Sequence, residues 1–75
     1  MSLVVYSDPV RELMARTEEL VPAAVIAPIL GMKADTIIKK AKMGLWDRGV
    51  CNYIISGTHV KFFRVDFLRK GGWIN

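Results

Sequence analysis

The chain is 75 residues long, carries a formal net charge of +4 and contains a single cysteine. This length allows one domain with a modest core, and the lone Cys51 excludes an internal disulfide framework and fits a reducing compartment. No apolar run approaches the roughly 18–20 residues that span a bilayer, and the N-terminus lacks the basic start and cleavage site of a signal peptide, so a single cytoplasmic domain over residues 1–75, without a membrane partner, is expected.

The first predicted helix covers residues 9–19. Asp8 followed by Pro9 is a favourable start, because an acidic cap and a proline at the first helical position both suit a helix N-terminus. Apolar residues then recur at helical spacing, at Val10, Leu13, Met14 and Leu20. Packing against the core is the expected role of this helix.

The second predicted helix covers residues 22–30, with Pro22 in its first turn. Pro28 removes one backbone donor inside this span, so a kink or a shortened helix is expected. Gly31 then supplies the left-handed conformation that ends a helix.

A third helix is predicted from Lys33 or Ala34 to about Met43, and Gly44 ends it. Apolar residues spaced by four predict its buried stripe, which consists of Ile37, Ala41 and Leu45. Lysines supply its polar surface, at Lys33, Lys39, Lys40 and Lys42.

A β-hairpin is predicted over about residues 50–63. Residues 50–56 and 58–63 are rich in strand formers, and Ser56-Gly57 between them is a turn dipeptide. If these two residues form the turn, the cross-strand pairs are Ile55 with Thr58, Tyr53 with Val60 and Cys51 with Phe62. The opposite face of the ribbon then carries Asn52, Ile54, His59 and Lys61, which is the alternation of a half-buried hairpin.

A last short helix is predicted over about residues 65–70, and Gly71-Gly72 ends it. Trp73 and Ile74 are then expected to fold back onto the core, and a contact between copies on DNA is the alternative. The predicted core consists of Leu30, Ile37, Ala41, Tyr53, Val60, Phe62, Phe67 and Leu68. Together these elements predict a small α+β domain of helices and a two-stranded hairpin.

Charge is unevenly distributed along the chain. Residues 1–30 carry two basic and four acidic side chains, a net of −2, whereas residues 31–75 carry nine basic and three acidic side chains, a net of +6. A one-sided positive field favours polyanions, because each neutralised phosphate releases condensed counterions. Charge alone fits a nucleic-acid partner and a merely solvated basic face equally well.

The two helices around Gly31 have the spacing of a helix-turn-helix. Ala27 lies four residues before Gly31 and Ile37 six after it. The small residue lets the helices approach, the glycine makes the turn and the apolar residue fixes the second helix against the first. That second helix can lie in the major groove of DNA. A purely structural helical corner has the same spacing, and the hairpin that follows, as a candidate wing, favours DNA binding.

At this point the chain resembles a known group of proteins. Residues 22–44, and within them Leu30-Gly31, Thr36-Ile37 and Gly44, resemble the helix-turn-helix of excisionases and related MerR-like winged domains of phages and mobile elements. Residues 56–68 resemble the wing hairpin and following short helix of that group, so the resemblance covers about residues 20–70. It implies a non-catalytic winged helix-turn-helix that binds repeated sites near attachment DNA, bends the DNA and steers an integrase towards excision.

Double-stranded DNA is therefore the expected partner, with an integrase and further copies of the chain on DNA as additional ones. The residues expected to contact DNA are Lys33, Asp35, Thr36, Lys39, Lys40, Lys42, Thr58, His59 and Lys61. Lys61 is expected to neutralise one phosphate, which would make Lys61→Ala reduce the magnitude of the salt slope by about 0.9. His59 would add charge only when protonated, mainly below neutral pH.

A repressor role and a protein-interaction role are the alternatives to this hypothesis. A small transcriptional repressor of the same fold is the nearest alternative, because some members of the group repress transcription. A protein-interaction module, such as an anti-repressor, would instead use exposed apolar anchors, for which the candidates are Ile38, Ile54 and Trp73.

Enzymatic and metal chemistry are not expected. In the predicted ribbon Cys51 and His59 lie on opposite faces and have no further soft ligands, which argues against a metal site and a nucleophilic pair. Trp46 and Trp73 are expected to cover the core rather than stack on nucleobases. The acidic side chains near the N-terminus are read as a solvated helix face, at Asp8, Glu12, Glu18 and Glu19. No cofactor is expected.

Overall fold

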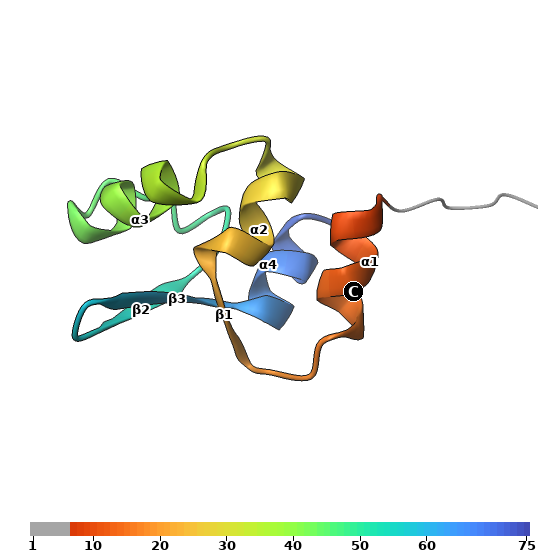
Figure 1. Ribbon diagram of the computed structural model, residues 1–75. Coiled ribbons are helices and arrows are strands. Elements are labelled where there is room, and N and C mark those ends of the chain that lie inside the picture. The colour runs from red at the N-terminus through yellow and green to blue at the C-terminus, as the bar shows by residue number, and fades with distance from the viewer. Residues whose placement is uncertain (1–6) are drawn as a thin grey trace, which may run out of the picture.

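The computed structural model, shown in Figure 1, describes residues 7–75 of the chain. Within that range it is a small α+β domain of four helices and one three-stranded antiparallel sheet, in the strand order β1-β3-β2. The elements in chain order are α1 (Asp8–Ala15), β1 (Leu20–Pro22), α2 (Ala23–Leu30), α3 (Ala34–Lys42), β2 (Tyr53–Ser56), β3 (His59–Phe63) and α4 (Arg64–Lys70).

Helix α1 begins at Asp8, one residue before the predicted start, so Ser7 and not Asp8 is the N-cap, and the helix is shorter than the predicted 9–19. Val10 and Leu13 face the core, and the backbone turns extended at Arg16, with ψ of 153°. The chain then runs to the sheet, where the N–H of Arg64 donates to the carbonyl of Glu19 at 2.9 Å. Pairing with the sheet therefore competes successfully with the last turn of the predicted helix.

Helices α2 and α3 form a close corner around Gly31. Gly31 has φ of +66°, and the N–H of Met32 donates to the carbonyl of Ala27 at 3.1 Å, the six-to-one bond of a Schellman motif. Helix α2 runs through Pro28 to Leu30, so, of the two outcomes expected there, a kink or a shortened helix, the shortening at Pro28 is wrong. The carbonyl that Pro28 leaves without an intrahelical donor belongs to Ala24, and since both residues are exposed, water can satisfy it.

The end of α3 departs from the predicted stripe. Ile37 and Ala41 are buried as predicted, but Leu45 is 65% exposed. Gly44, with φ of +72°, ends the helix, so Leu45 no longer follows the helical period. Trp46 covers the core in its place: its indole is buried, and its Nε1–H donates to the carbonyl of Cys51 at 3.1 Å.

The hairpin turn consists of Gly57 and Thr58, not of the predicted Ser56 and Gly57. Ser56 pairs with His59, and the pairs behind it are Ile55 with Val60, Ile54 with Lys61 and Tyr53 with Phe62. Gly57 has φ of +60°, which the first central residue of a type II′ turn requires, whereas the predicted turn would place Ser56 there. The register differs from the predicted one by two residues, and every side chain therefore keeps its predicted face.

The predicted two-stranded hairpin is part of a larger sheet. Strand β1 pairs with β3, with Leu20 opposite Phe63, Val21 opposite Phe62 and Pro22 opposite Lys61. A three-residue strand that ends in proline carries almost no strand pattern of its own, which is why the sequence did not predict it. The sheet supports the core with one face, and Tyr53 ties that face to α3 by donating its hydroxyl to the carbonyl of Ala41 at 3.1 Å.

The predicted core and C-terminus are largely confirmed. The buried members of the predicted core are Ile37, Ala41, Tyr53, Val60, Phe62, Phe67 and Leu68. Leu30 is only partly buried, because it is the last residue of α2 and lines the mouth of a surface pocket. The Trp73 ring stacks on Phe67 with centroids 5.4 Å apart, so the C-terminal pair folds back onto the core.

Candidate nucleic-acid interface

The outward face of α3 gathers most of the side chains predicted to contact DNA. Ile37 and Ala41 occupy the buried side of the helix, and Ala34 and Ile38 flank them. The predicted contact residues on this segment are all exposed, namely Lys33, Asp35, Thr36, Lys39, Lys40 and Lys42. Figure 1 shows α3 at one end of the molecule and α1, which carries two acidic residues, at the other.

The cations of the domain divide into two groups by the contacts they make. Each of the five arginines has a partner within the described residues: Arg11 with Asp8, Arg16 with Glu18, Arg48 with the Tyr53 ring, Arg64 with the Glu18 carbonyl and Arg69 with the Asn75 carbonyl. Lys70 contacts both Asp66 and the Arg48 carbonyl.

The ammonium groups of the other lysines make no hydrogen bond or ion pair with residues 7–75, and these lysines are Lys33, Lys39, Lys40, Lys42 and Lys61. Four of these five lie on α3 or at its N-cap. The arginines are therefore engaged with groups of the chain itself, and most of the charge that is free to bind an anion lies along one helix.

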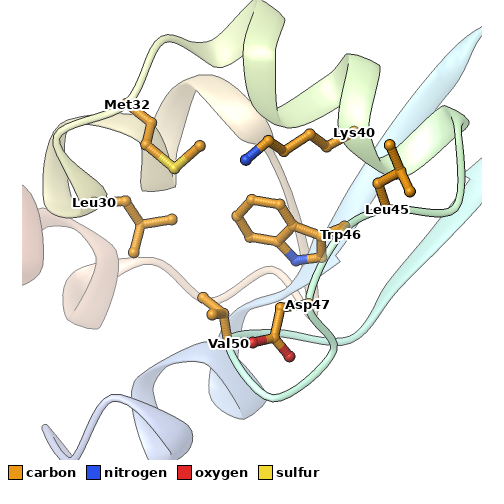
Figure 2. Close-up of a pocket in the computed structure, with 7 residues that line it drawn as sticks. All are labelled: Leu30, Met32, Lys40, Leu45, Trp46, Asp47 and Val50. Carbon is orange, nitrogen blue, oxygen red and sulfur yellow. The ribbon is translucent and has the colours of Figure 1, made fainter.

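Lys40 differs in surroundings from the other lysines of α3. A pocket of about 220 Å³ lies between α3, the end of α2 and the loop after Gly44, and it is lined by Leu30, Met32, Lys40, Leu45, Trp46, Asp47 and Val50. Figure 2 shows the Lys40 side chain extended across this pocket, with its nitrogen between Met32 and the Trp46 ring in this view. Its ammonium group therefore lies on the pocket side of α3.

The predicted wing residues are not all placed beside α3. Thr58 and His59 are exposed near the hairpin tip, but Lys61 is half-buried on the central strand, between Pro22 and Ile54. Side chains alternate along a strand, so Lys61 points to the opposite side from its neighbours Val60 and Phe62, which face the core beneath α3. The sheet thus separates Lys61 from the lysines of α3, and its side chain, expected to face solvent, is half-buried on the outer face of the sheet.

Sequence analysis missed one exposed apolar side chain on the same face of α3. Met43 is 62% exposed and follows Thr36 and Lys39 by seven and four residues, which places it in the same row on the helix surface. The sequence pattern marked Met43 only as the end of the helix. Its spacing of seven residues from Thr36 was the signal that places it on this face. An exposed methionine among lysines adds an apolar contact to an otherwise polar face.

The alternative interface anchors differ in accessibility. Ile38 and Trp73 are partly buried and packed against the core. Ile54 is 38% exposed on the outer face of the sheet, and its neighbour Ile55 is 51% exposed. Only the hairpin therefore offers exposed isoleucines to a protein partner within the described residues.

Cys51 is part of the core. It is fully buried, and its Sγ lies 3.1 Å from the carbonyl oxygen of Asn52 and 3.3 Å from that of Phe63. Burial, together with the nearby Asp66 carboxylate, raises the pKa of the Cys51 thiol from 9.0 to about 12. His59 is exposed, and residues 7–75 contain no group of three or more His, Cys, Asp or Glu side chains that could hold a metal ion.

Cys51 should therefore resist alkylation while the domain is folded. At pH 8 we expect iodoacetamide to label the folded protein at least about 100-fold more slowly than the urea-unfolded chain, because the thiolate is the reactive form. Above about pH 9 the thiol of the unfolded chain ionises while the folded one stays protonated, so the free energy of unfolding should fall as the pH rises towards 12. Equal labelling rates in the two states would contradict the buried placement of this thiol.

The described part of the chain contains no helix long and apolar enough to cross a membrane. Comparison of the chain with protein-family models, with curated proteins and with solved structures gives no match.

Proposed function

We propose that the chain is a non-catalytic winged helix-turn-helix domain that binds double-stranded DNA through the outward face of α3. The observation that carries this proposal is a set of lysines on the second helix of a close helical corner and at its N-cap, whose ammonium groups make no hydrogen bond or ion pair with residues 7–75. An ammonium group without a partner in the folded chain is free to neutralise a phosphate.

The geometry of α3 suits a helix that enters the major groove. Such helices dock with their N-terminal residues at the base edges, which assigns Asp35 and Thr36 to the bases or the nearest phosphates. Asp35 also lies in the first turn, where a carboxylate is favourable to the helix dipole, and this structural role is sufficient to explain it. Lys39 and Lys42, further along the helix, are then the phosphate contacts that set affinity.

The hairpin is the proposed wing. Its tip, at Gly57 and Thr58, lies at the same end of the molecule as α3 (Figure 1). Contacts from the tip would come from Thr58 and from backbone N–H groups, which position a domain on phosphates without reading sequence.

The resemblance to excisionases supports architectural binding at repeated sites, as a recombination directionality factor working with an integrase. A small repressor of the same fold is the alternative role. Both roles need the same DNA contacts, and an integrase gene next to the coding sequence would favour the first.

The test of DNA binding is a titration of the native chain onto duplex DNA over a range of salt concentrations. If the three lysines on the outward face, Lys33, Lys39 and Lys42, each contact one phosphate, the logarithm of the association constant should fall with the logarithm of salt concentration with a slope of about −2.7. Absence of binding at low salt, or affinity independent of salt, would exclude the proposal.

Lys61→Ala tests which surface faces the DNA. Lys61 lies on the sheet face away from α3, so we expect this variant to keep the native salt slope. The sequence alone predicts instead that the magnitude of the slope falls by about 0.9. The measurement is affinity against salt for both proteins on one duplex. A loss of one unit of slope would show that the outer face of the hairpin also lies against the DNA.

A further inference from the structure

We infer that the free edge of strand β2 pairs with the same edge of a second copy of this chain, so that two sheets join into one. Strand β2 lies at one edge of the sheet, with β3 as its single neighbour in the described residues. A strand edge that presents unpaired N–H and C=O groups is a template for another strand. This inference concerns the free protein and does not depend on the proposed DNA binding.

The register of the hairpin identifies which backbone groups are open. The N–H of Phe63 donates to the carbonyl of Asn52 at 3.1 Å, so these two residues form a hydrogen-bonded pair. Hydrogen-bonded and non-hydrogen-bonded pairs alternate along an antiparallel ladder, and Ile54 is therefore bonded to Lys61. Tyr53 and Ile55 direct their N–H and C=O groups away from β3, towards the free edge.

The two edges of the sheet differ in the protection they carry. The β1 edge is three residues long and contains Pro22, which has no N–H to donate, and helix α2 begins at the next residue. The β2 edge contains no proline and no charge, and both of its isoleucines are exposed. Features that normally block edge pairing are thus present on β1 and absent from β2.

Charge favours a second copy as the partner at this edge. Residues 49–58 contain no Asp, Glu, Lys, Arg or His side chain, in a chain whose net charge is +4. Strand β2 can therefore meet its own copy without bringing like charges opposite one another, whereas two basic α3 faces cannot.

Strand β2 is also complementary to itself. In an antiparallel arrangement with Ile54 opposite Ile54 of the second copy, Tyr53 of each copy lies opposite Ile55 of the other. All the open backbone groups of Tyr53 and Ile55 then form hydrogen bonds, and the two Ile54 side chains meet as a close non-hydrogen-bonded pair. The two-fold axis runs perpendicular to the sheet, so both copies keep their α3 helices on the same side of the joined sheet.

The contact is small, and the dimer should be weak. Four residues on each side cover far less than the roughly 800 Å² per partner of a standard interface. We expect monomer at low micromolar concentration and a growing fraction of dimer as the concentration approaches about 1 mM, measured by sedimentation equilibrium without DNA.

Substitution of Ile54 tests the register directly. Ile54→Lys places two like charges opposite one another, and we expect it to weaken self-association about tenfold or more, with Ile54→Glu behaving alike. An equal mixture of Ile54→Lys and Ile54→Glu should restore the dimer, because the opposed charges then attract. Thr58→Lys, which adds the same charge at the exposed tip beyond β2, is the matched control and should dimerise as the native chain does. Circular dichroism checks that each variant is folded.

Amide exchange gives a second, independent readout. In the native chain the Ile55 amide should gain protection as the concentration rises, whereas the Ile54 amide, bonded to β3 at every concentration, should change little. A native chain that stays monomeric up to about 1 mM would overturn the inference. So would an Ile54→Lys chain that dimerises like the native one, or a mixture of the two charged variants that does not associate.

Discussion

Truncation of Phe62 to alanine is expected to lower the free energy of unfolding by about 3–5 kcal/mol. Phe62 is fully buried on the core face of the central strand β3, and its ring lies with centroids 5.7 Å from Trp46 and 5.9 Å from Tyr53. The substitution removes apolar burial and leaves a cavity among side chains from several elements. A loss of this size is comparable with the whole stability of a domain this small, so much of the variant should be unfolded at 25 °C.

The adjacent residue provides a matched control for Phe62→Ala. Phe63 has the same side chain, lies on the same strand and is only half-buried, because it points to the outer face of the sheet. Phe63→Ala should cost clearly less than Phe62→Ala in urea or thermal unfolding followed by circular dichroism. Equal losses for the two variants would show that the core does not lie on the side of the sheet that the structure assigns.

The double variant Lys39→Gln and Lys42→Gln is expected to weaken duplex binding about 30-fold at 0.15 M salt. Through counterion release, each phosphate contact raises the association constant at 0.15 M salt roughly fivefold relative to its value at 1 M, and the effects of the two contacts multiply. Glutamine removes the charge but keeps helix propensity and length, so α3 should stay intact. The measurement is affinity by anisotropy or calorimetry at several salt concentrations, where the slope should fall in magnitude by about 1.8.

The control for this variant removes the same charge elsewhere. Arg11→Gln with Arg16→Gln changes the net charge equally, but these residues lie on α1 and directly after it, at the other end of the molecule from α3 (Figure 1). Their ion pairs are exposed and contribute little to stability. Similar losses of affinity for both double variants would mean that binding follows net charge and that α3 is not the DNA-facing surface.

Local chemistry determined much of this fold. Gly31 ends α2 because only glycine adopts a positive φ at low cost, and the spacing of Ile37 and Ala41 fixes the buried side of α3. That side in turn determines which lysines face outward, so the basic helix face follows from the sequence. The faces of the hairpin also follow, because strand alternation survives a two-residue change of register.

Contacts between distant segments and the path of one loop decided features of the fold that the local sequence pattern could not predict. Strand β1 exists because β3 presents open backbone groups beside residues Leu20–Pro22, and the same pairing ends α1 before its predicted limit. Trp46 replaces Leu45 in the core because Gly44 redirects the chain after α3. No periodicity in the sequence encodes either outcome, since each depends on segments far apart in the chain or on the path of a loop.

Within the candidate site, Lys61 shows most clearly which features the sequence predicts and which the tertiary structure decides. Sequence places it correctly on the polar face of the hairpin, among residues that a wing would use. Only the tertiary structure shows that α3 packs on the other face, through the Tyr53 hydroxyl and the Ala41 carbonyl, and that a third strand lies beside Lys61. Alternation fixes which side chains share a face, but the packing of helices on the sheet decides which of those faces lies towards α3.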